Sequence, residues 1–169
     1  IQGTTGVDTI LGRAGNDNLF GNGGNDIIFG EDGNDKLLGG FGNDYLDGGN
    51  GNDIIADVGG KNTIFGGAGN DTIMVGLGAS LIDGGGGNDT IYLLFGEDTI
   101  ALTRGNGSDT INNYNAGSTR FSLTGGLTFN DLTIAQDGSS TLIRAGGERL
   151  ASLAGVQANS VTANSFITA

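Results

Sequence analysis

The sequence repeats with a period of nine residues, and this period limits the possible folds more than any other feature. Five consecutive units, residues 12–56, read GRAGNDNLF, GNGGNDIIF, GEDGNDKLL, GGFGNDYLD and GGNGNDIIA. Each unit has Gly at places one and four, Asn at place five, Asp at place six, and Ile or Leu at place eight. Such a period indicates a stacked repeat architecture, in which each unit packs mainly against its neighbours.

An apolar residue fills place eight of every unit, and it predicts the secondary structure. One branched side chain in nine residues is too sparse for an amphipathic helix. It suits a three-residue strand whose middle side chain points inward while the flanking side chains point outward. The six Gly-rich residues between strands are expected to form a turn, because Gly allows positive φ and close backbone approach. The place-eight residues are Ile10, Leu19, Ile28, Leu37, Leu46, Ile55, Ile64, Ile73, Ile82, Ile91, Ile100 and, after a two-residue insertion, Ile111.

Two strand–turn units close one coil of 18 residues, and stacked coils place alternate strands in two parallel sheets. The predicted fold is all-β: a right-handed parallel β-roll, which is a two-sheet solenoid with a thin core of Ile and Leu. Each coil adds about 4.7–4.9 Å, the spacing of neighbouring strands. A core this thin buries little apolar surface, so another interaction has to hold the turns together.

Acidic residues at place six are the candidates for that interaction. Because a coil has 18 residues, alternate repeats stack on the same edge of the roll. Carboxylates stacked at one strand spacing repel one another unless a cation lies between them. Asp also favours turns, but that preference does not require ten Asp at one phase of the period. One edge carries Asp17, Asp35, Asp53, Asp71 and Asp89; the other carries Asp8, Asp26, Asp44, Asn62, Ser80 and Asp98, and Asp109 follows the insertion.

The ligands that these turns offer are all oxygen atoms, from carboxylates and from Gly-loop carbonyls. Such a set indicates a hard cation, and Ca²⁺ is favoured over Mg²⁺ because flexible loops tolerate about six to eight ligands of variable geometry. Asn62 and Ser80 interrupt one edge, so sites that use Asn62 or Asp98 are expected to be weaker, and a weaker site is also expected at Asp109, after the insertion. The six full sites are expected at Asp8/Asp26, Asp26/Asp44, Asp17/Asp35, Asp35/Asp53, Asp53/Asp71 and Asp71/Asp89.

The composition argues against several other classes of function. The chain has no His and no Cys, which removes the usual general base, the usual zinc ligands and any disulfide. No H-E-x-x-H or G-x-S-x-G motif occurs, so we expect no catalytic site in these residues. The net charge of −12 argues against nucleic-acid binding. No apolar run is long enough to span a membrane. Ile1 and Gln2 already fill places eight and nine, so we expect a chain that starts inside a longer array or was trimmed.

Charge and periodicity both change near residue 112. Residues 1–112 carry the whole net charge of −12, whereas acidic and basic residues cancel in 113–169. The later segment is denser in apolar residues and is expected to cap the exposed end of the roll. Stretches 132–135 and 141–144 flank a turn and predict a β-hairpin, with further strands at 148–153 and 165–167. We therefore expect a calcium-binding roll over 1–112 and a capping segment over 113–169.

These units resemble the glycine-rich nonapeptide G-G-x-G-x-D-x-U-x of the RTX, or haemolysin-type, calcium-binding repeat family, over residues 3–101 and again over 105–112. The departures are Val7, Asn62, Val75 and Ser80. The resemblance implies a Ca²⁺-loaded β-roll in a bacterial protein that type I secretion machinery exports and that folds outside the cell. It also implies an uncleaved export signal in the C-terminal segment. RTX modules occur on toxins, proteases, lipases, epimerases and adhesins, so the resemblance implies a module and not an activity.

We therefore predict a secreted calcium-binding repeat module that folds on binding extracellular Ca²⁺ and serves as a structural or folding unit. The alternative is a self-assembling component of a surface layer, filament or adhesin. Outward apolar residues 18 apart would stack into stripes that support self-association. A C-terminal module of a secreted enzyme or toxin ranks third. The stripes comprise Phe20, Leu38, Met74 and Tyr92 on one sheet, and Ile27, Phe29, Tyr45, Phe65 and Leu81 on the other.

Overall fold

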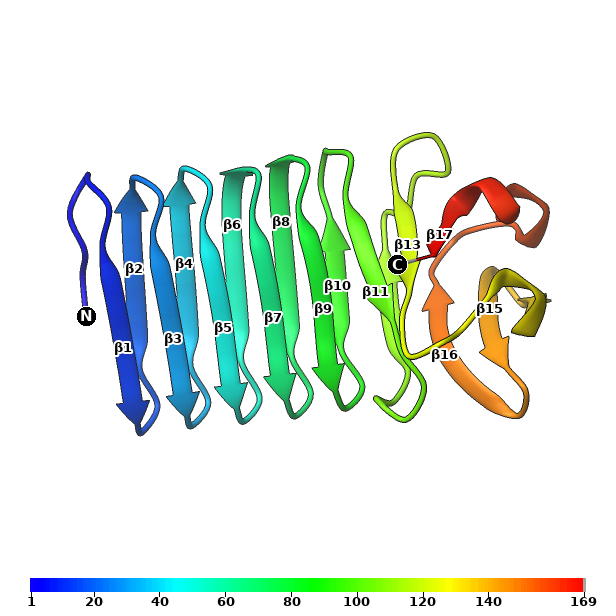
Figure 1. Cartoon of the computed structure of the whole chain (residues 1–169), viewed down its shortest axis with the longest axis horizontal. Helices are drawn as coiled ribbons and strands as arrows, with labels where there is room; N and C mark the ends of the chain where they lie inside the picture. Colours follow the sequence, from blue (N-terminus) through cyan, green and yellow to red (C-terminus); the bar gives the residue numbers. More distant parts are fainter. Residues whose placement is uncertain (169) are drawn as a thin grey trace.

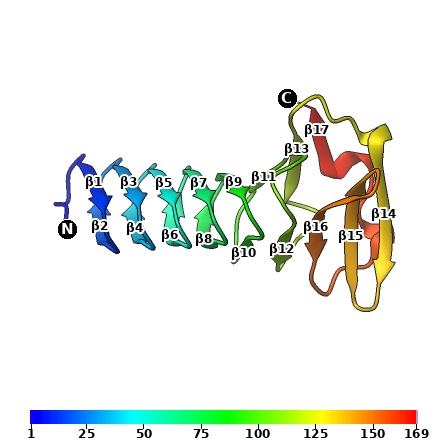
Figure 2. The same cartoon turned by 90° about the horizontal axis from the view of Figure 1, so that it is seen from below.

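Successive strands alternate between two sheets and stack into a solenoid (Figures 1 and 2). The structure is a computed structural model that describes residues 1–168. Within these residues one sheet has the order β1-β3-β5-β7-β9-β11-β13-β17 and the other β14-β15-β16-β12-β10-β8-β6-β4-β2. The repeat strands are β1 (Thr9–Ala14), β2 (Asn18–Gly23), β3 (Ile27–Asp32), β4 (Lys36–Phe41), β5 (Tyr45–Asn50), β6 (Ile54–Gly60), β7 (Thr63–Ala68), β8 (Thr72–Gly78), β9 (Leu81–Gly86), β10 (Thr90–Leu93), β11 (Thr99–Leu102) and β12 (Asp109–Asn112).

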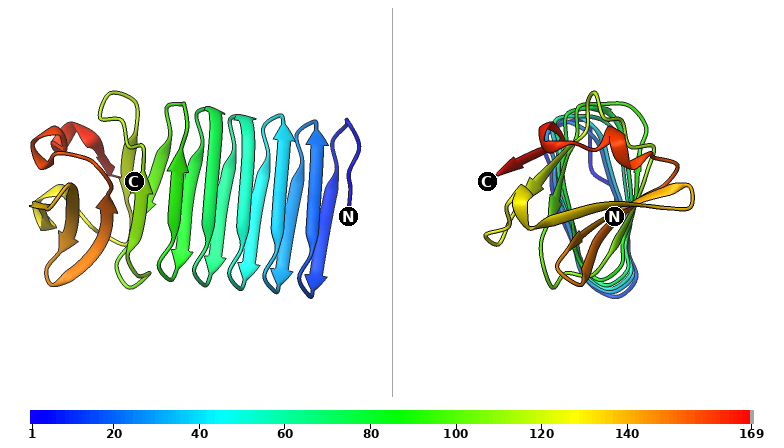
Figure 3. Two further views of the ribbon diagram at one scale, coloured as in Figure 1. Left: turned by 180° about the vertical axis from the view of Figure 1, so that it is seen from behind. Right: turned by 90° about the vertical axis from the view of Figure 1, so that its right-hand side faces the viewer.

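The register between neighbouring strands confirms the predicted coil of 18 residues. Strands β1 and β3 are parallel, and Thr9 pairs with Ile27. Strands β3 and β5 pair in the same way, with Ile28 opposite Leu46. Viewed along the axis, the coils superimpose as a flattened ring (Figure 3). The fold is thus an all-β, two-sheet parallel solenoid, as the nine-residue period predicts.

Place-eight side chains form the core between the two sheets, as predicted. Ile10 is 5% exposed, and the place-eight residues from Leu19 to Ile111 are all fully buried. Their neighbours at place seven point outward: in β6, Ile54 is 43% exposed while Ile55 is fully buried. One inward apolar side chain per strand from β1 to β7 builds a continuous but narrow core, and Val75, Leu93 and Leu102 add a second one in β8, β10 and β11.

The strands are longer than the three residues expected from the apolar pattern. Strand β2, for example, has six residues and continues to Gly23, so that Gly21 at place one is also buried. Only places four to six remain as the turn. The turns stack closely: Gly33 has a φ of +137°, and a Cβ there would overlap the carbonyl of Gly15. Strand length was missed because glycine gives no apolar periodicity, although it pairs in a parallel ladder when coils hold it there.

The segment after residue 112 continues both sheets and covers the end of the roll (Figure 2). β12 pairs in parallel with β16, and β13 pairs in parallel with β11 and β17. The predicted hairpin is confirmed as the antiparallel pair β14–β15, and the strand predicted at 148–153 is β16. The elements of this segment are β13 (Arg120–Leu123), η1 (Phe129–Asp131), β14 (Leu132–Asp137), β15 (Ser140–Ala145), β16 (Glu148–Leu153), η2 (Ala158–Ser160), η3 (Ala163–Ser165) and β17 (Phe166–Thr168).

Aromatic side chains close the core at this end. Phe121 is fully buried, stacks on Tyr114 with ring centroids 5.4 Å apart and contacts Phe166 at the same distance. Phe129 packs on the outer side of Phe166 at 5.3 Å. This apolar cluster is continuous with the place-eight core of the roll. The described helices are each three residues long, so none of them could cross a membrane.

Adjacent residues of β6 test the inward position of place eight. Ile55→Ala should lower the free energy of unfolding by about 2–5 kcal/mol, because it leaves a cavity in a core one side chain wide. Ile54→Ala, on the outward position, should change it by no more than about 0.5 kcal/mol. Urea unfolding of both variants in saturating Ca²⁺ measures the difference. Equal losses would contradict the assigned register of β6.

Candidate metal centre

Place-six Asp side chains form a hydrogen-bonded ladder along one edge of the roll. The main-chain N–H of each Asp donates to Oδ1 of the place-six side chain one coil further on. This ladder is unbroken on the edge that begins at Asp17, and it crosses the two-residue insertion to reach Asp109. Its N···O distances are 2.7 Å for Asp17–Asp35, Asp35–Asp53 and Asp53–Asp71, 2.8 Å for Asp71–Asp89 and 3.1 Å for Asp89–Asp109.

The opposite edge carries an interrupted ladder. The amides of Asp8 and Asp26 each donate to the next Asp at 2.8 Å, and the amide of Asp44 donates to Asn62 Oδ1 at 2.9 Å. Among the described residues, no hydrogen bond joins the Asn62 amide to the Ser80 side chain. The pattern resumes only where the Ser80 amide donates to Asp98 Oδ1 at 2.9 Å. The two edges of the roll are therefore chemically different.

At seven place-six Asp residues, the second carboxylate oxygen, Oδ2, is buried without a hydrogen-bond donor among the described residues. Asp8 differs, because its Oδ2 accepts from the Thr4 amide at 2.6 Å and from the Thr4 hydroxyl at 2.9 Å. A buried carboxylate oxygen without a partner is costly, because it has lost its hydration and gained no hydrogen bond in exchange. Such an oxygen fits a bound cation. The place-six residues whose buried Oδ2 has no partner are Asp17, Asp26, Asp35, Asp44, Asp53, Asp71 and Asp89.

Each of these oxygens faces a gap beside a place-one glycine, which we call the cradle. A Cβ at Gly30 would lie 2.5 Å from Asp35 Oδ2 and still closer to the carbonyl oxygen of Gly48, so the missing side chain leaves room between two oxygen atoms. Carboxylate and carbonyl oxygens are the ligands that Ca²⁺ takes. The first Asp of each predicted pair lines one such cradle, whereas the second Asp of the pair is not among the nearest atoms there. Cradles of this kind, with an Asp Oδ2 and a carbonyl of the next coil, lie at Gly3, Gly12, Gly21, Gly30, Gly48 and Gly66.

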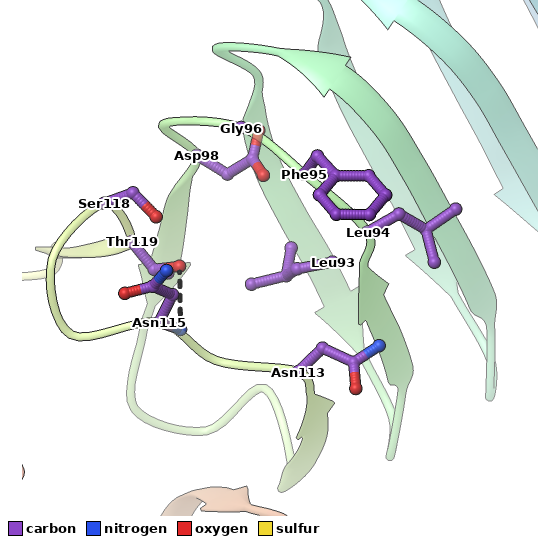
Figure 4. A pocket seen from close by; sticks show the side chains of 9 residues that line it. All are labelled: Leu93, Leu94, Phe95, Gly96, Asp98, Asn113, Asn115, Ser118 and Thr119. Atoms are coloured by element: carbon purple, nitrogen blue, oxygen red, sulfur yellow. Dashed lines mark hydrogen bonds between the residues drawn. The ribbon is translucent and has the colours of Figure 1, made fainter.

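The remaining predicted ligands lie in less regular surroundings. At Gly84 the nearest atoms all belong to Asp89, with no carbonyl of the next coil among them, and Asp109 lies beyond the insertion. Asp98 accepts from the Ser80 amide and lines a cavity of about 250 Å³ with Asn113 and Asn115 (Figure 4). No group of three or more acidic side chains converges in the described part of the chain. Backbone carbonyls would therefore have to supply a large share of any ion's ligands.

Sequence reasoning missed a second type of ladder, which the Asn residues at place five form. The Asn34 amide donates to Asn16 Oδ1 at 2.8 Å, and the Asn52 amide donates to Asn34 Oδ1 at 2.6 Å. These bonds run from a later coil to an earlier one, opposite to the Asp ladder. Together the Asp ladders and the Asn ladder provide acceptors for turn amides that make no strand-pairing hydrogen bond. The signal was present, since Asn recurs at place five with the same period as Asp at place six.

Asp57 is a second residue that sequence reasoning missed. It occupies place one, where most units have Gly, in the same unit that has Asn62 in place of Asp. Its side chain is buried, and its Oδ1 accepts from the Gly59 amide at 2.8 Å and from Asn62 Nδ2 at 2.7 Å. A comparison of the residues at places one and six of each unit would have identified Asp57.

Burial makes the charged form of several ladder carboxylates unfavourable. Desolvation raises the pKa of Asp53 to about 6, with the nearby charges of Asp35 and Asp47 adding to the shift. Desolvation also raises the pKa of Asp71 to about 7 and that of Asp109 to about 7, and neighbouring carboxylates act in the same direction. The fold therefore requires that either protons or cations neutralise these groups.

Comparison with known proteins agrees with this geometry. A family profile described as the RTX calcium-binding nonapeptide repeat matches residues 2–37, 20–55, 47–82, 65–100 and 76–111. The crystal structure of the extracellular lipase LipA from Serratia marcescens has a similar fold, with a TM-score of 0.58 and 18% identity. The match covers 99% of this chain and 39% of that chain, so this chain spans about two fifths of the lipase.

A weaker likeness links the chain to a subunit of the mannuronan C5-epimerase from Azotobacter vinelandii. Its solution structure gives a TM-score of 0.27 at 18% identity, covering 97% of this chain and 80% of that one. A score this low supports no structural argument. No curated protein sequence matches the chain.

At low pH, protons should neutralise the ladder carboxylates in place of a cation and so stabilise the roll. The folded-state pKa values of Asp53, Asp71 and Asp109 lie above the unfolded value of about 3.9. Such groups stabilise the fold fully below the unfolded pKa and lose that contribution as pH rises through the folded pKa. In chelator, β-structure measured by circular dichroism should be present near pH 4 and lost between about pH 6 and 7. A spectrum that is the same at pH 4 and pH 8 would contradict this expectation.

Proposed function

The chain belongs to the family of RTX calcium-binding nonapeptide repeats, and from that premise we propose that it is a secreted structural module that folds when its turns bind extracellular Ca²⁺. The observation that carries the proposal is the row of buried Oδ2 atoms without hydrogen-bond donors on both edges of the roll. The described coils bury carboxylates in regular stacks, and only neutralisation makes such stacks stable.

The calcium ligands would be the ladder carboxylates together with carbonyl oxygens at the cradles. Calcium supplies positive charge between adjacent coils when it binds, and it replaces the missing hydrogen-bond donors of Oδ2. About six ions, at two charges each, would match the net charge of −12 that residues 1–112 carry. The residues proposed to hold them are Asp8, Asp17, Asp26, Asp35, Asp44, Asp53, Asp71 and Asp89, with Asn62, Asp98 and Asp109 at weaker sites.

Conditional folding follows from this charge. Without a cation at neutral pH, the stacked carboxylates repel one another and their burial is unfavourable, so the open chain is favoured. Extracellular calcium-binding modules bind with dissociation constants of about 10⁻⁴–10⁻³ M, and this range suits a chain that stays open at low cytosolic Ca²⁺. The name of the similar lipase, which is described as extracellular, supports a secreted location. Family membership supports export by the type I machinery.

The segment 113–169 would act as a cap for the roll. Support comes from the pairing of β16 with β12 and of β17 with β13, which extends both sheets beyond the last repeat. The antiparallel strands β14 and β15 then end one sheet, and Phe121 and Leu123 close the core. The place-six carboxylates of the roll are committed to the ladders, and we assign them no catalytic role.

A second candidate function is lateral self-assembly, and one surface favours it. On the outer face of the eight-stranded sheet, Tyr45 lies between Phe29 and Phe65, with ring centroids 5.5 and 5.6 Å away. Ile27 and Leu81 on the same face are 41% and 42% exposed. An aligned apolar stripe of this kind is typical of a contact surface. Electron microscopy of the Ca²⁺-loaded chain would reveal filaments or layers, and monomers at high concentration would count against assembly.

Calcium titration tests the main proposal. In chelator at neutral pH the circular dichroism spectrum should be that of an unfolded chain, and Ca²⁺ should produce β-structure in a cooperative transition. A chain that is already β-rich in chelator and does not respond to Ca²⁺ would sink the proposal.

A single carboxylate on the unbroken ladder tests the ligand assignment. Asp53→Asn should lower the stability of the Ca²⁺-loaded fold by about 1.5–3 kcal/mol, because a buried charged ligand is lost while the shape is kept. The matched control is Asp137→Asn, which removes the same charge from an exposed position beside the β14–β15 turn. The measurement is the Ca²⁺ concentration at half-folding, which should rise for Asp53→Asn and stay unchanged for the control.

A further inference from the structure

The unit that contains Asp57 and Asn62 departs from the repeat at two places at once. In most other units place one is Gly and place six is Asp, but here an acidic residue occupies place one and an amide occupies place six. Asp57 is 5% exposed and Asn62 is 3% exposed, so both side chains lie inside the edge of the roll. The unit therefore still has a buried carboxylate, at place one instead of place six.

The two oxygens of Asp57 have different environments. Oδ1 is fixed by two donors, the Gly59 amide at 2.8 Å and Asn62 Nδ2 at 2.7 Å. Oδ2 is buried and has no hydrogen-bond partner. Because the two donors orient the carboxylate, Oδ2 is held toward the preceding coil.

That preceding coil presents a second buried oxygen without a partner. Asp44 is 3% exposed, and its Oδ2 also lacks a hydrogen-bond donor. A Cβ placed at Gly39 would lie 2.6 Å from Asp44 Oδ2 and still closer to Asp57 Oδ2. The two unpartnered oxygens therefore face the same cradle from adjacent coils.

A regular cradle on the same edge shows what has changed. At Gly21, the oxygen that joins Asp26 Oδ2 is the carbonyl oxygen of Gly39. At Gly39, the oxygen that joins Asp44 Oδ2 is a carboxylate oxygen of Asp57. The cradle at Gly39 therefore also has two oxygen atoms, and it has one more carboxylate than the cradle at Gly21. It does so although Asn62 replaces the place-six Asp in the unit of Asp57.

The following coil provides an internal comparison. There Ser80 replaces the place-six Asp and Val75 replaces the place-one Gly, and Val75 is 1% exposed. An apolar side chain thus fills the place-one position where no oxygen pair is formed. In the Asp57 unit the same position is filled by a carboxylate that points at another carboxylate.

From this geometry we infer that Asp44 and Asp57 form an additional Ca²⁺ site, in which Asp57 replaces the ligand lost at Asn62. The inference rests on the proposed calcium-binding function and extends it to a position where the repeat motif predicts only a weak site. It also changes the ligand assignment: Asn62 is a positioning residue that orients Asp57 through its Nδ2 donor. The competing explanation is that the two carboxylates share a proton.

Asp57→Asn is the variant that tests this site, because it keeps Oδ1 as an acceptor for Gly59 and Asn62 while removing the charge. Equilibrium dialysis of the whole chain against Ca²⁺ at neutral pH should show one calcium equivalent fewer than the wild type. The double variant Asp57→Gly with Asn62→Asp restores the repeat motif and should restore that equivalent. Asp137→Asn is the charge-matched control and should bind as the wild type does. Circular dichroism in Ca²⁺ checks that each variant is folded.

The outcomes separate this inference from the proposed function. If Asp57→Asn binds as many ions as the wild type with unchanged affinity, the Asp44–Asp57 site is wrong and a shared proton explains the pair. If Asp57→Asn is not folded in Ca²⁺, Asp57→Gly decides, because it restores the regular place-one residue while Asn62 stays: a folded Asp57→Gly chain that binds as many ions as the wild type overturns the inference. If the wild-type chain binds no Ca²⁺, both the proposed function and this site are overturned.

Discussion

Buried carboxylates that link neighbouring coils are the interaction on which this structure depends. Asp35 is representative: its Oδ1 accepts the Asp17 amide of the preceding coil, while its Oδ2 is buried without a donor. The place-eight core supplies only one apolar side chain per strand, which is little for a chain of this length. The ladders add the missing links between coils, but they leave negative charge inside the fold. Stability therefore depends on what neutralises that charge.

Cradles and apolar packing exclude each other along the interrupted edge of the roll. A cradle exists only where place one has no Cβ, as at Gly21 and Gly39 on the interrupted edge. Toward the cap the same place holds Val75 and then Leu93, which are 1% and 4% exposed. Each of these side chains widens the core where a regular cradle has been lost. On this edge the roll thus changes from carboxylate-rich turns to apolar packing as it approaches residues 113–168, while the other edge keeps its ladder to Asp109.

The sequence predicts the coil well because the period itself is the structural information. Place eight, the offset of 18 and the hairpin between β14 and β15 all follow from patterns of apolar residues and turn residues. Strand length does not follow, because glycine at places one to three carries no apolar signal. Asp57 was missed because its meaning depends on Asn62 and on Asp44 one coil away, a relation that exists only once the coils are stacked.

Sharing of carboxylates between coils explains why such a roll should respond to Ca²⁺ as a unit. The Asp53 side chain accepts the Asp35 amide through Oδ1, and its Oδ2 faces the cradle at Gly48 together with the carbonyl of Gly66. One side chain thus contacts the coil before it and the coil after it. Neutralising one cradle fixes groups that belong to the next, so neighbouring sites are coupled through the same residues. On the interrupted edge this chain of shared residues stops between Asn62 and Ser80, and the coils there rely on the intact edge and on the apolar core.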